Sequence, residues 1–138
     1  MNANSVTQQI SLHTFAYGGE FELTAVFSYD ADEPHEVRMV FHDGLEEPIA
    51  WVFARGLLAE GLSTLAGKGL VETWPAGDGQ NLVISLCSSK GSRAEFTASA
   101  VSVACFLEAT YWLVAPGAEP ARTDIDAGIA AILAGGAS

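Results

Sequence analysis

Three histidines and their acidic neighbours are the residues of this chain best suited to acid–base or metal chemistry. His42 precedes Asp43, a pairing suited to general acid–base catalysis, and His42 with His35 offers two nitrogen ligands for a transition metal. However, His35 stands at the start of a predicted strand and His42 at its end, so both flank turns. We interpret these two residues and His13 as structural or exposed, and we predict neither a metal site nor a cofactor.

Two other stretches resemble ligand-binding loops but lack essential positions. Residues 30–33 have the acidic spacing of a calcium loop, yet Pro34 occupies the third ligand position and the required glycine is missing. Residues 61–68 contain two glycines and a lysine, as a phosphate loop does. Five residues separate these glycines where the motif has four, and Gly69 replaces the Ser or Thr. Neither stretch predicts a ligand site.

The charge balance opposes binding to nucleic acid or to an anionic membrane. The chain has 138 residues, with 6 Lys and Arg against 17 Asp and Glu, for a net charge of −11. Neutralising a phosphate backbone requires clustered cations, whereas these six are scattered: Arg38, Arg55, Lys68, Lys90, Arg93 and Arg122. The longest apolar stretch, residues 101–115, is shorter than the roughly 20 residues of a membrane span. Because no secretory signal is apparent either, we expect a cytoplasmic protein without membrane insertion.

Alternating apolar residues and turn signals predict one α+β domain over residues 1–138. Gly18-Gly19, for example, is a hairpin signal between two alternating runs. Strands are predicted at residues 6–17, 20–29, 37–41, 49–54, 70–74, 82–88 and 94–98, and helices at residues 56–64, 101–114 and 124–134. This order indicates antiparallel sheets in two strand-rich units, each closed by a helix.

The two C-terminal helices differ in their patterns. Residues 101–114 are apolar nearly all round, so we expect burial on more than one side, in part against another subunit. Cys105 in this helix and Cys87 in a strand are predicted to be small buried residues. The final helix is amphipathic, with one apolar face made of Ile125, Ile129, Ile132 and Leu133.

A strand passes directly into a helix at Arg55-Gly56. The apolar positions on either side are predicted to be core: Trp51, Phe53, Leu57, Leu58 and Leu62. Arg55 and Glu60 are the polar members of this run and admit two interpretations. Arg55 either pairs with a nearby carboxylate at the strand end, with Glu60 on the exposed helix face, or both belong to a partner-binding edge. The residues themselves favour the first interpretation.

The central run is similar to that of the SsgA-like sporulation and cell-division proteins of actinomycetes. Phe41-His42 to Glu46-Glu47 are followed by Trp51-Val52-Phe53-Ala54-Arg55, Leu57-Leu58-Ala59-Glu60-Gly61-Leu62 and Gly67. Val71 to Trp74-Pro75, Phe106-Leu107 and Asp124-Ile125-Asp126 follow in the corresponding order. The resemblance covers nearly the whole chain and is greatest to the SsgB branch.

This resemblance implies a non-enzymatic adaptor. Family members act in septum-site selection during sporulation-specific division, where the SsgB type is placed by an SsgA relative and recruits the tubulin-like protein FtsZ. The family fold resembles Whirly-type single-strand-binding proteins, and its subunits assemble as a trimer. We therefore expect a homotrimer that is recruited to the division septum, with FtsZ and SsgA-like relatives as partners.

One segment departs from the family pattern. After Phe106-Leu107 the family carries basic and polar residues, whereas this chain has Glu108-Ala109-Thr110-Tyr111-Trp112-Leu113. We expect the change to affect oligomer packing or the partner surface, so Trp112 joins Arg55 and Glu60 as a candidate partner-binding residue. The alternative function is single-stranded nucleic-acid binding on a Whirly-like sheet, which the negative charge opposes.

Overall fold

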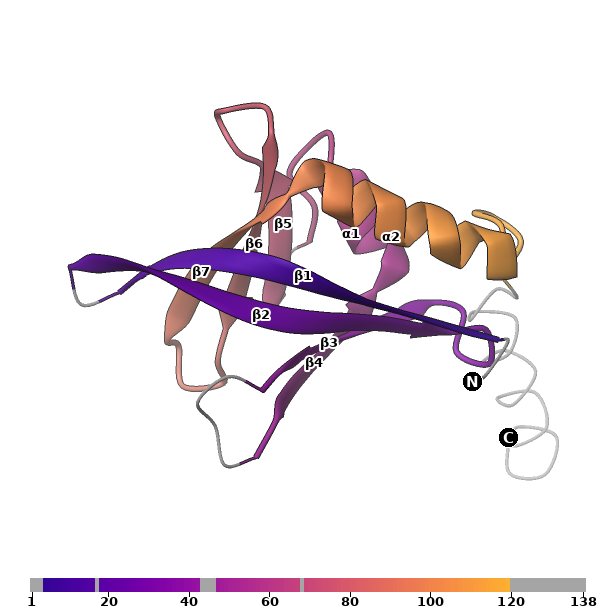
Figure 1. Ribbon diagram of the computed structural model, residues 1–138, viewed down its shortest axis with the longest axis horizontal. Coiled ribbons are helices and arrows are strands. Elements are labelled where there is room, and N and C mark those ends of the chain that lie inside the picture. The colour runs from indigo at the N-terminus through magenta and orange to yellow at the C-terminus, as the bar shows by residue number, and fades with distance from the viewer. Residues whose placement is uncertain (1–3, 17, 43–46, 68, 120–138) are drawn as a thin grey trace, which may run out of the picture.

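A computed structural model describes residues 4–16, 18–42, 47–67 and 69–119 of the protein. Seven strands and two helices follow one another along the chain (Figure 1). Their bounds are β1 Ser5–Ala16, β2 Gly19–Asp30, β3 Glu36–Phe41, β4 Ile49–Ala54, α1 Arg55–Gly61, β5 Val71–Pro75, β6 Asn81–Cys87, β7 Arg93–Ser99 and α2 Ala100–Leu113. The predicted α+β class and all seven predicted strands are confirmed. The predicted helix at residues 124–134 lies outside the described residues.

All seven strands form one curled antiparallel sheet, in the order β4-β3-β2-β1-β7-β6-β5. The units β1 to β4 with α1 and β5 to β7 with α2 correspond to the two predicted units. They are joined where β1 pairs with β7, in the register Leu12 to Ala98 and Thr14 to Phe96. The pairing of the first strand with the last thus merges both units into one sheet.

The β1–β2 hairpin extends beyond the rest of the sheet (Figure 1). β7 pairs with β1 only from Leu12 to Thr14, and β3 pairs with β2 only from Ala25 to Ser28. Residues 15 and 16 therefore pair only with β2, and residues 19–22 only with β1. We call residues 15–16 and 19–22 the hairpin arm. Gly18 in its turn has a φ of 76°, a conformation that glycine adopts readily.

The core lies between the inner face of the curled sheet and the two helices. Strand alternation directs Leu12, Phe27 and Met39 to this face, where each is fully buried. α2 lies across β1, β6 and β7 (Figure 1), and its Phe106 ring meets the Phe27 ring edge to face at a centroid distance of 5.7 Å. Such aromatic pairs add stability beyond the area that they bury.

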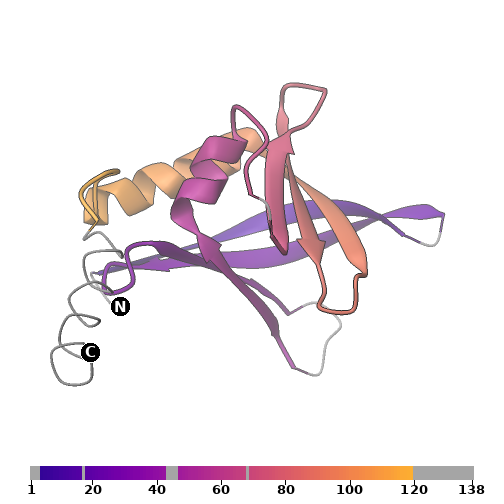
Figure 2. The ribbon, with the colours of Figure 1, turned by 180° about the vertical axis from the view of Figure 1, so that it is seen from behind.

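α1 fills one end of the space between the two edge strands, β4 and β5 (Figure 2). The Thr73 hydroxyl on β5 donates a hydrogen bond of 2.8 Å to the Leu57 carbonyl oxygen. Gly61 lies against the same threonine, so closely that a Cβ there would overlap its side chain. The helix was predicted to reach residue 64 but ends at Gly61, because the chain continues from Leu62 as a turn.

None of the helices in the described part of the chain combines the length and apolarity that a membrane crossing requires.

The two cysteines correct the sequence prediction. Cys87 is half-buried and Cys105 is exposed, and both are free thiols. A helix that is apolar nearly all round, such as α2, has no continuous polar face to mark its solvent-exposed side. The sequence pattern therefore did not show that Cys105 is exposed.

Candidate interaction site

Arg55 occupies the junction between β4 and α1 and is buried, with only 2% of its surface exposed. Its Nη1 donates hydrogen bonds to the Val114 carbonyl oxygen at 2.7 Å and to Thr110, at 3.5 Å to the carbonyl oxygen and 3.4 Å to Oγ1. Its Nη2 donates to Glu119 Oε2 at 2.7 Å. The guanidinium therefore has acceptors from both α2 and the segment that follows it.

This arrangement places a cation at the C-terminal end of α2, a helix whose own last turn contains no basic residue. A positive charge there stabilises the unpaired carbonyl groups of a helix. The guanidinium carbon also lies 4.8 Å from the Tyr29 ring centroid and 5.0 Å from that of Tyr111, in cation–π geometry. Arg55 thus clamps the end of α2 to β2 and α1.

The burial of Arg55 favours its interpretation as an internal ion-pair residue. With its guanidinium enclosed, Arg55 offers no surface for direct contact with a partner, which corrects its candidacy as a partner-binding residue. Its carboxylate partner, Glu119, comes from the far end of the described chain and not from the strand end itself. Arg55 can influence a partner surface only by fixing the position of α2.

The pKa values of two neighbours reflect this clamp. The hydrogen bond from Arg55 holds the pKa of the Glu119 carboxyl below its ordinary value, helped by the Gly117 N–H, which donates to Oε1 at 2.7 Å. Burial raises the pKa of the Tyr29 hydroxyl, and the charge of Arg55 opposes part of that rise. The Tyr29 hydroxyl donates to the Pro34 carbonyl oxygen at 3.0 Å.

Glu60 and Trp112, the other candidate partner-binding residues, both face solvent. Glu60 is exposed on α1 and makes no ion pair with any other described residue. Trp112 is 85% exposed near the end of α2. The structure places them on different helices. Both residues are accessible to a partner.

The exposed face of α2 forms an apolar strip along the helix, which we call the α2 strip. It consists of Val101, Ala104, Cys105, Glu108 and Trp112. Its opposite face is buried through Val103, Phe106 and Leu107, at the spacing expected for one side of a helix. Val101 is 71% exposed, and Glu108 is the only charged residue of the strip. Exposed apolar surface of this kind is typical of a protein contact.

The predicted core residues of the strand–helix run lie in or against the core. Phe53 and Leu58 are buried, with 7% and 0% exposed. Trp51, Leu57 and Leu62 are partly buried and pack against the same cluster. Trp51 also lines an apolar cleft that the sequence pattern did not predict.

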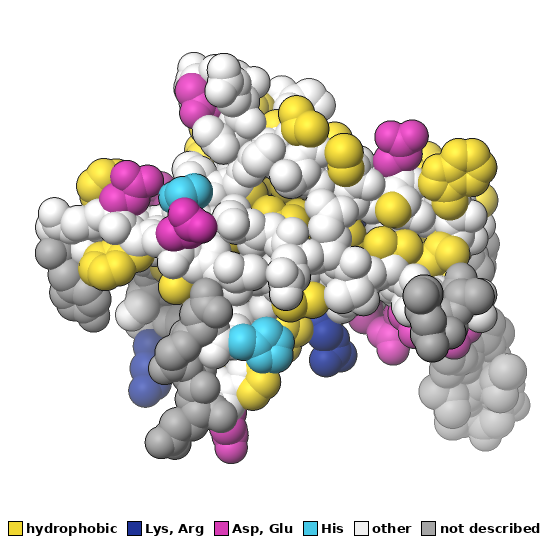
Figure 3. All heavy atoms as spheres, in the orientation of Figure 1, with side chains coloured by type: hydrophobic (Ala, Val, Ile, Leu, Met, Phe, Trp, Pro, Cys, Tyr) yellow, Lys and Arg dark blue, Asp and Glu magenta, His cyan; other side chains and the backbone are white. Residues whose placement is uncertain are grey.

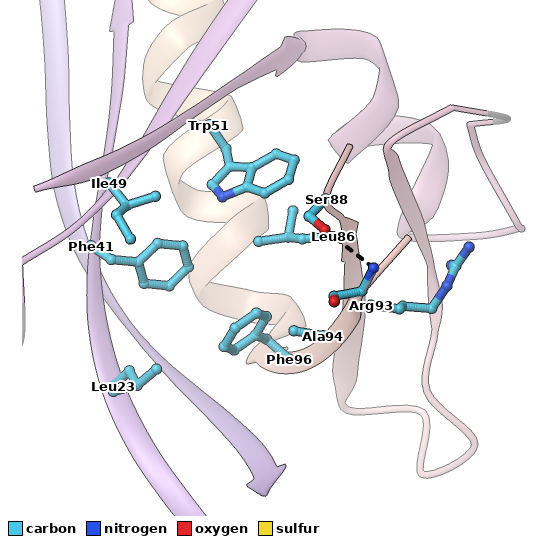
Figure 4. A pocket seen from close by; sticks show the side chains of 10 residues that line it. Leu23, Phe41, Ile49, Trp51, Leu86, Ser88, Arg93, Ala94 and Phe96 are labelled. Carbon is cyan, nitrogen blue, oxygen red and sulfur yellow. Dashed lines mark hydrogen bonds between the residues drawn. The ribbon is translucent and has the colours of Figure 1, made fainter. Parts of the chain in front are cut away.

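This cleft has a volume of about 480 Å³ and opens between β4 and the ends of β6 and β7. Figure 4 shows apolar side chains converging from both sides: Leu23, Phe41, Ile49 and Trp51 on one, and Leu86, Ala94 and Phe96 on the other. The Phe41 and Phe96 rings meet at its floor, with centroids 5.4 Å apart. Ser88 and Ser92 also line the cleft, and the Ser92 N–H donates to Ser88 Oγ at 3.2 Å.

The histidines do not come together. His35 and His42 flank β3 at opposite ends, so the strand holds them roughly 20 Å apart, at about 3.3 Å per residue. His13 Nδ1 lies 3.4 Å from Glu20 Oε1 on the hairpin arm. Near residues 30–33, the Glu36 carboxylate raises the pKa of the Glu33 carboxyl, because the protonated form of Glu33 can donate a hydrogen bond to it. Within the described ranges, no group of three His, Cys, Asp or Glu residues is arranged to hold a metal ion.

Comparison with known proteins gives consistent matches along the chain. The family described as "Streptomyces sporulation and cell division protein, SsgA" matches residues 23–119. The chain is 42% identical over 107 residues to the sporulation-specific cell division protein SsgB of Streptomyces coelicolor, covering 77% of this chain and 78% of that protein. It is 40% identical over 109 residues to SsgB of Thermobifida fusca, covering 78% and 79%.

Solved structures agree with these matches. An SsgA-like sporulation-specific cell division protein from Thermobifida fusca superimposes with a TM-score of 0.76 at 37% identity, covering 94% of this chain and 98% of that one. A structure described as "Mutations in SsgB correlate to longitudinal cell division during sporulation of Streptomyces coelicolor" gives a TM-score of 0.75 at 37% identity, covering 83% and 92%.

The curled antiparallel sheet and its relatives define a protein of the sporulation and cell-division class. The chain belongs to the SsgA-like family, and its similarity to SsgB proteins places it on the SsgB branch. Its role is accordingly in cell division during sporulation.

Proposed function

We propose that this protein is a non-enzymatic adaptor that recruits the FtsZ division machinery to sporulation septa. The observation that carries the proposal is the α2 strip, where Trp112 is 85% exposed. Tryptophan is among the residues that contribute most to binding energy at protein interfaces. Covering a large, solvent-exposed indole with a partner surface lowers the free energy of the complex.

The proposed mechanism is recruitment by several copies of one surface. The protein acts as a homo-oligomer, a trimer, so that each assembly presents the α2 strip more than once. Because a polymer such as FtsZ repeats its own surface, the second contact forms within an already bound complex, at a high effective concentration. Weak single contacts then give firm attachment without any chemical step.

SsgA-like relatives are the second class of proposed partner, and the cytoplasmic face of the septum is the proposed place of action. Glu60 is the candidate for such contacts outside α2, because it is exposed and without an ion-pair partner among the described residues. Its carboxylate suits a basic residue on a relative, although an exposed pair of this kind contributes only about 0.2–1 kcal/mol.

Co-sedimentation with polymerised FtsZ tests the proposal. The native protein is expected to pellet with polymer, and Trp112→Ala to lose most of that pelleting while remaining folded by circular dichroism. Val52→Ala is the matched control, since Val52 is apolar and 48% exposed but lies on β4, away from the α2 strip. Failure of the native chain to pellet would count against direct recruitment.

Glu60→Ala in the same assay separates the two helices. Loss of pelleting in this variant would assign α1 to the FtsZ contact as well. Unchanged pelleting would show that Glu60 does not contribute to the FtsZ contact. Its contact with an SsgA-like relative is then tested by pull-down.

A further inference from the structure

The hairpin arm carries two exposed aromatic side chains. Phe15 is 79% exposed and Phe21 is 47% exposed. In the β1–β2 register Phe15 lies opposite Glu20, and His13 lies opposite Glu22, so both carboxylates share the face of Phe15. Figure 3 shows apolar and acidic side chains together at the end of this hairpin. The arm therefore presents an apolar knob with an acidic border.

The apolar cleft has the complementary character. Its volume is about 480 Å³, whereas a cavity of about 150 Å³ is enough to hold benzene. Ile49 at its mouth is 50% exposed. Among the exposed cations of the described chain, Lys90 and Arg93 belong to the turn and strand end that border this cleft. Arg93 already pairs with Glu72 at 3.0 Å, while Lys90 makes no ion pair with a described residue.

The arm of a molecule cannot place Phe15 in its own cleft. Leu23, which follows the arm on β2, forms part of the cleft wall and shares the inner face with Leu12. Phe15 is an odd-numbered residue of β1, so strand alternation directs it to the opposite face. Only the cleft of another molecule can receive this side chain.

We infer that the hairpin arm of one copy of this protein occupies the apolar cleft of the next copy. The contact buries Phe15 against Ile49 and Trp51, and it brings Glu20 and Glu22 towards Lys90. Because it joins two different surfaces, every copy offers one arm and accepts one arm. Contacts of this heterologous type close into a ring when the rotation between copies allows it.

This inference rests on the proposed homo-oligomer and specifies how its copies meet. It also leaves the α2 strip outside the contact, free for FtsZ. The competing arrangement is contact between copies through the α2 strip itself, as the apolar pattern of that helix first suggested. The two arrangements predict opposite effects of variants on the arm and on α2.

Mixing two variants tests the contact. Phe15→Ser removes the knob but keeps the cleft, and Ile49→Lys blocks the cleft but keeps the knob. By native mass spectrometry and sedimentation velocity, each variant alone is expected to be monomeric under conditions where the native chain is oligomeric. An equimolar mixture is expected to form a heterodimer through the one intact arm and the one intact cleft. Val52→Ser, an exposed substitution away from both surfaces, is expected to retain the native mass.

Charge reversal adds a second readout. Lys90→Glu opposes Glu20 and Glu22 and is expected to raise the dissociation constant of the oligomer roughly two- to fivefold, as for an exposed ion pair.

Four results would overturn the arm–cleft contact. Retention of the native mass by Phe15→Ser is one, and failure of the two monomeric variants to associate on mixing is another. Dissociation by Trp112→Ala with no effect of Phe15→Ser is the third, and it assigns the oligomer contact to α2 while the homo-oligomer stands. If the native chain is monomeric under all conditions, both the proposed homo-oligomer and the arm–cleft contact are wrong. Co-sedimentation with FtsZ then tests the adaptor function independently.

Discussion

Arg55 Nη2 and Glu119 Oε2 lie 2.7 Å apart although the two residues are 64 positions apart in the chain. This pair ties the start of α1 to the segment after α2, and with it the position of Trp112. Because the guanidinium is buried, its loss leaves several acceptors without a donor.

Arg55→Ala is expected to lower the free energy of unfolding by about 3 kcal/mol, at the lower end of the range for breaking a buried ion pair, since Glu119 keeps some exposure. Urea denaturation followed by circular dichroism measures the change. Arg55→Lys is the matched control that keeps the charge, and it is expected to recover only part of the loss because it lacks the planar fork. Native stability in Arg55→Ala would show that the clamp contributes nothing.

The contribution of Glu119 to stability is expected to depend on pH. Since its folded pKa is lowered from 4.5, the ion pair stabilises fully above that value, and the contribution is lost as pH falls through the folded pKa. The difference in unfolding free energy between the native chain and Glu119→Gln should therefore shrink progressively as the pH falls below 4.5. A difference that stays constant over that range would contradict the assigned role.

Gly61→Ala is expected to destabilise the protein by about 1–3 kcal/mol, because the added methyl group overlaps the Thr73 side chain. Gly56→Ala on the same helix is the control, since a Cβ there meets nothing within 4 Å. Thermal unfolding of the two variants gives the comparison. Equal melting temperatures would show that β5 shifts to accommodate the methyl group.

Trp112→Ala is expected to change the unfolding free energy by no more than about 0.5 kcal/mol, as for an exposed residue without a structural role. This result would separate the proposed role of Trp112 in FtsZ binding from any effect of the substitution on folding. A loss of several kcal/mol would indicate that Trp112 supports the fold.

Labelled single-stranded DNA is expected not to bind at low salt, given the net charge of −11. Fluorescence anisotropy measures this directly. Tight binding that weakens steeply with added salt would instead support the nucleic-acid alternative.

Alternation against one core face was sufficient to predict strands such as β2 and β3. β6 was instead marked by a short apolar run between turns, because it is buried on both faces. Neither pattern could predict the Arg55 clamp, since neither Tyr29 nor Glu119 is near Arg55 in sequence. The cleft was missed for the same reason, as Trp51 and Phe96 come from opposite halves of the sheet. Such sites depend on how the sheet curls, and no local pattern records that curvature.

The pairing of Leu12 with Ala98 also has a consequence for synthesis on the ribosome. β1 lies in the middle of the sheet, yet one of its edges stays without a partner until β7 has been translated. Closing so long a loop makes the pairing slow. The nascent four-strand unit therefore exposes an open edge during most of translation, and chaperone contact or premature association would act on β1 during that interval.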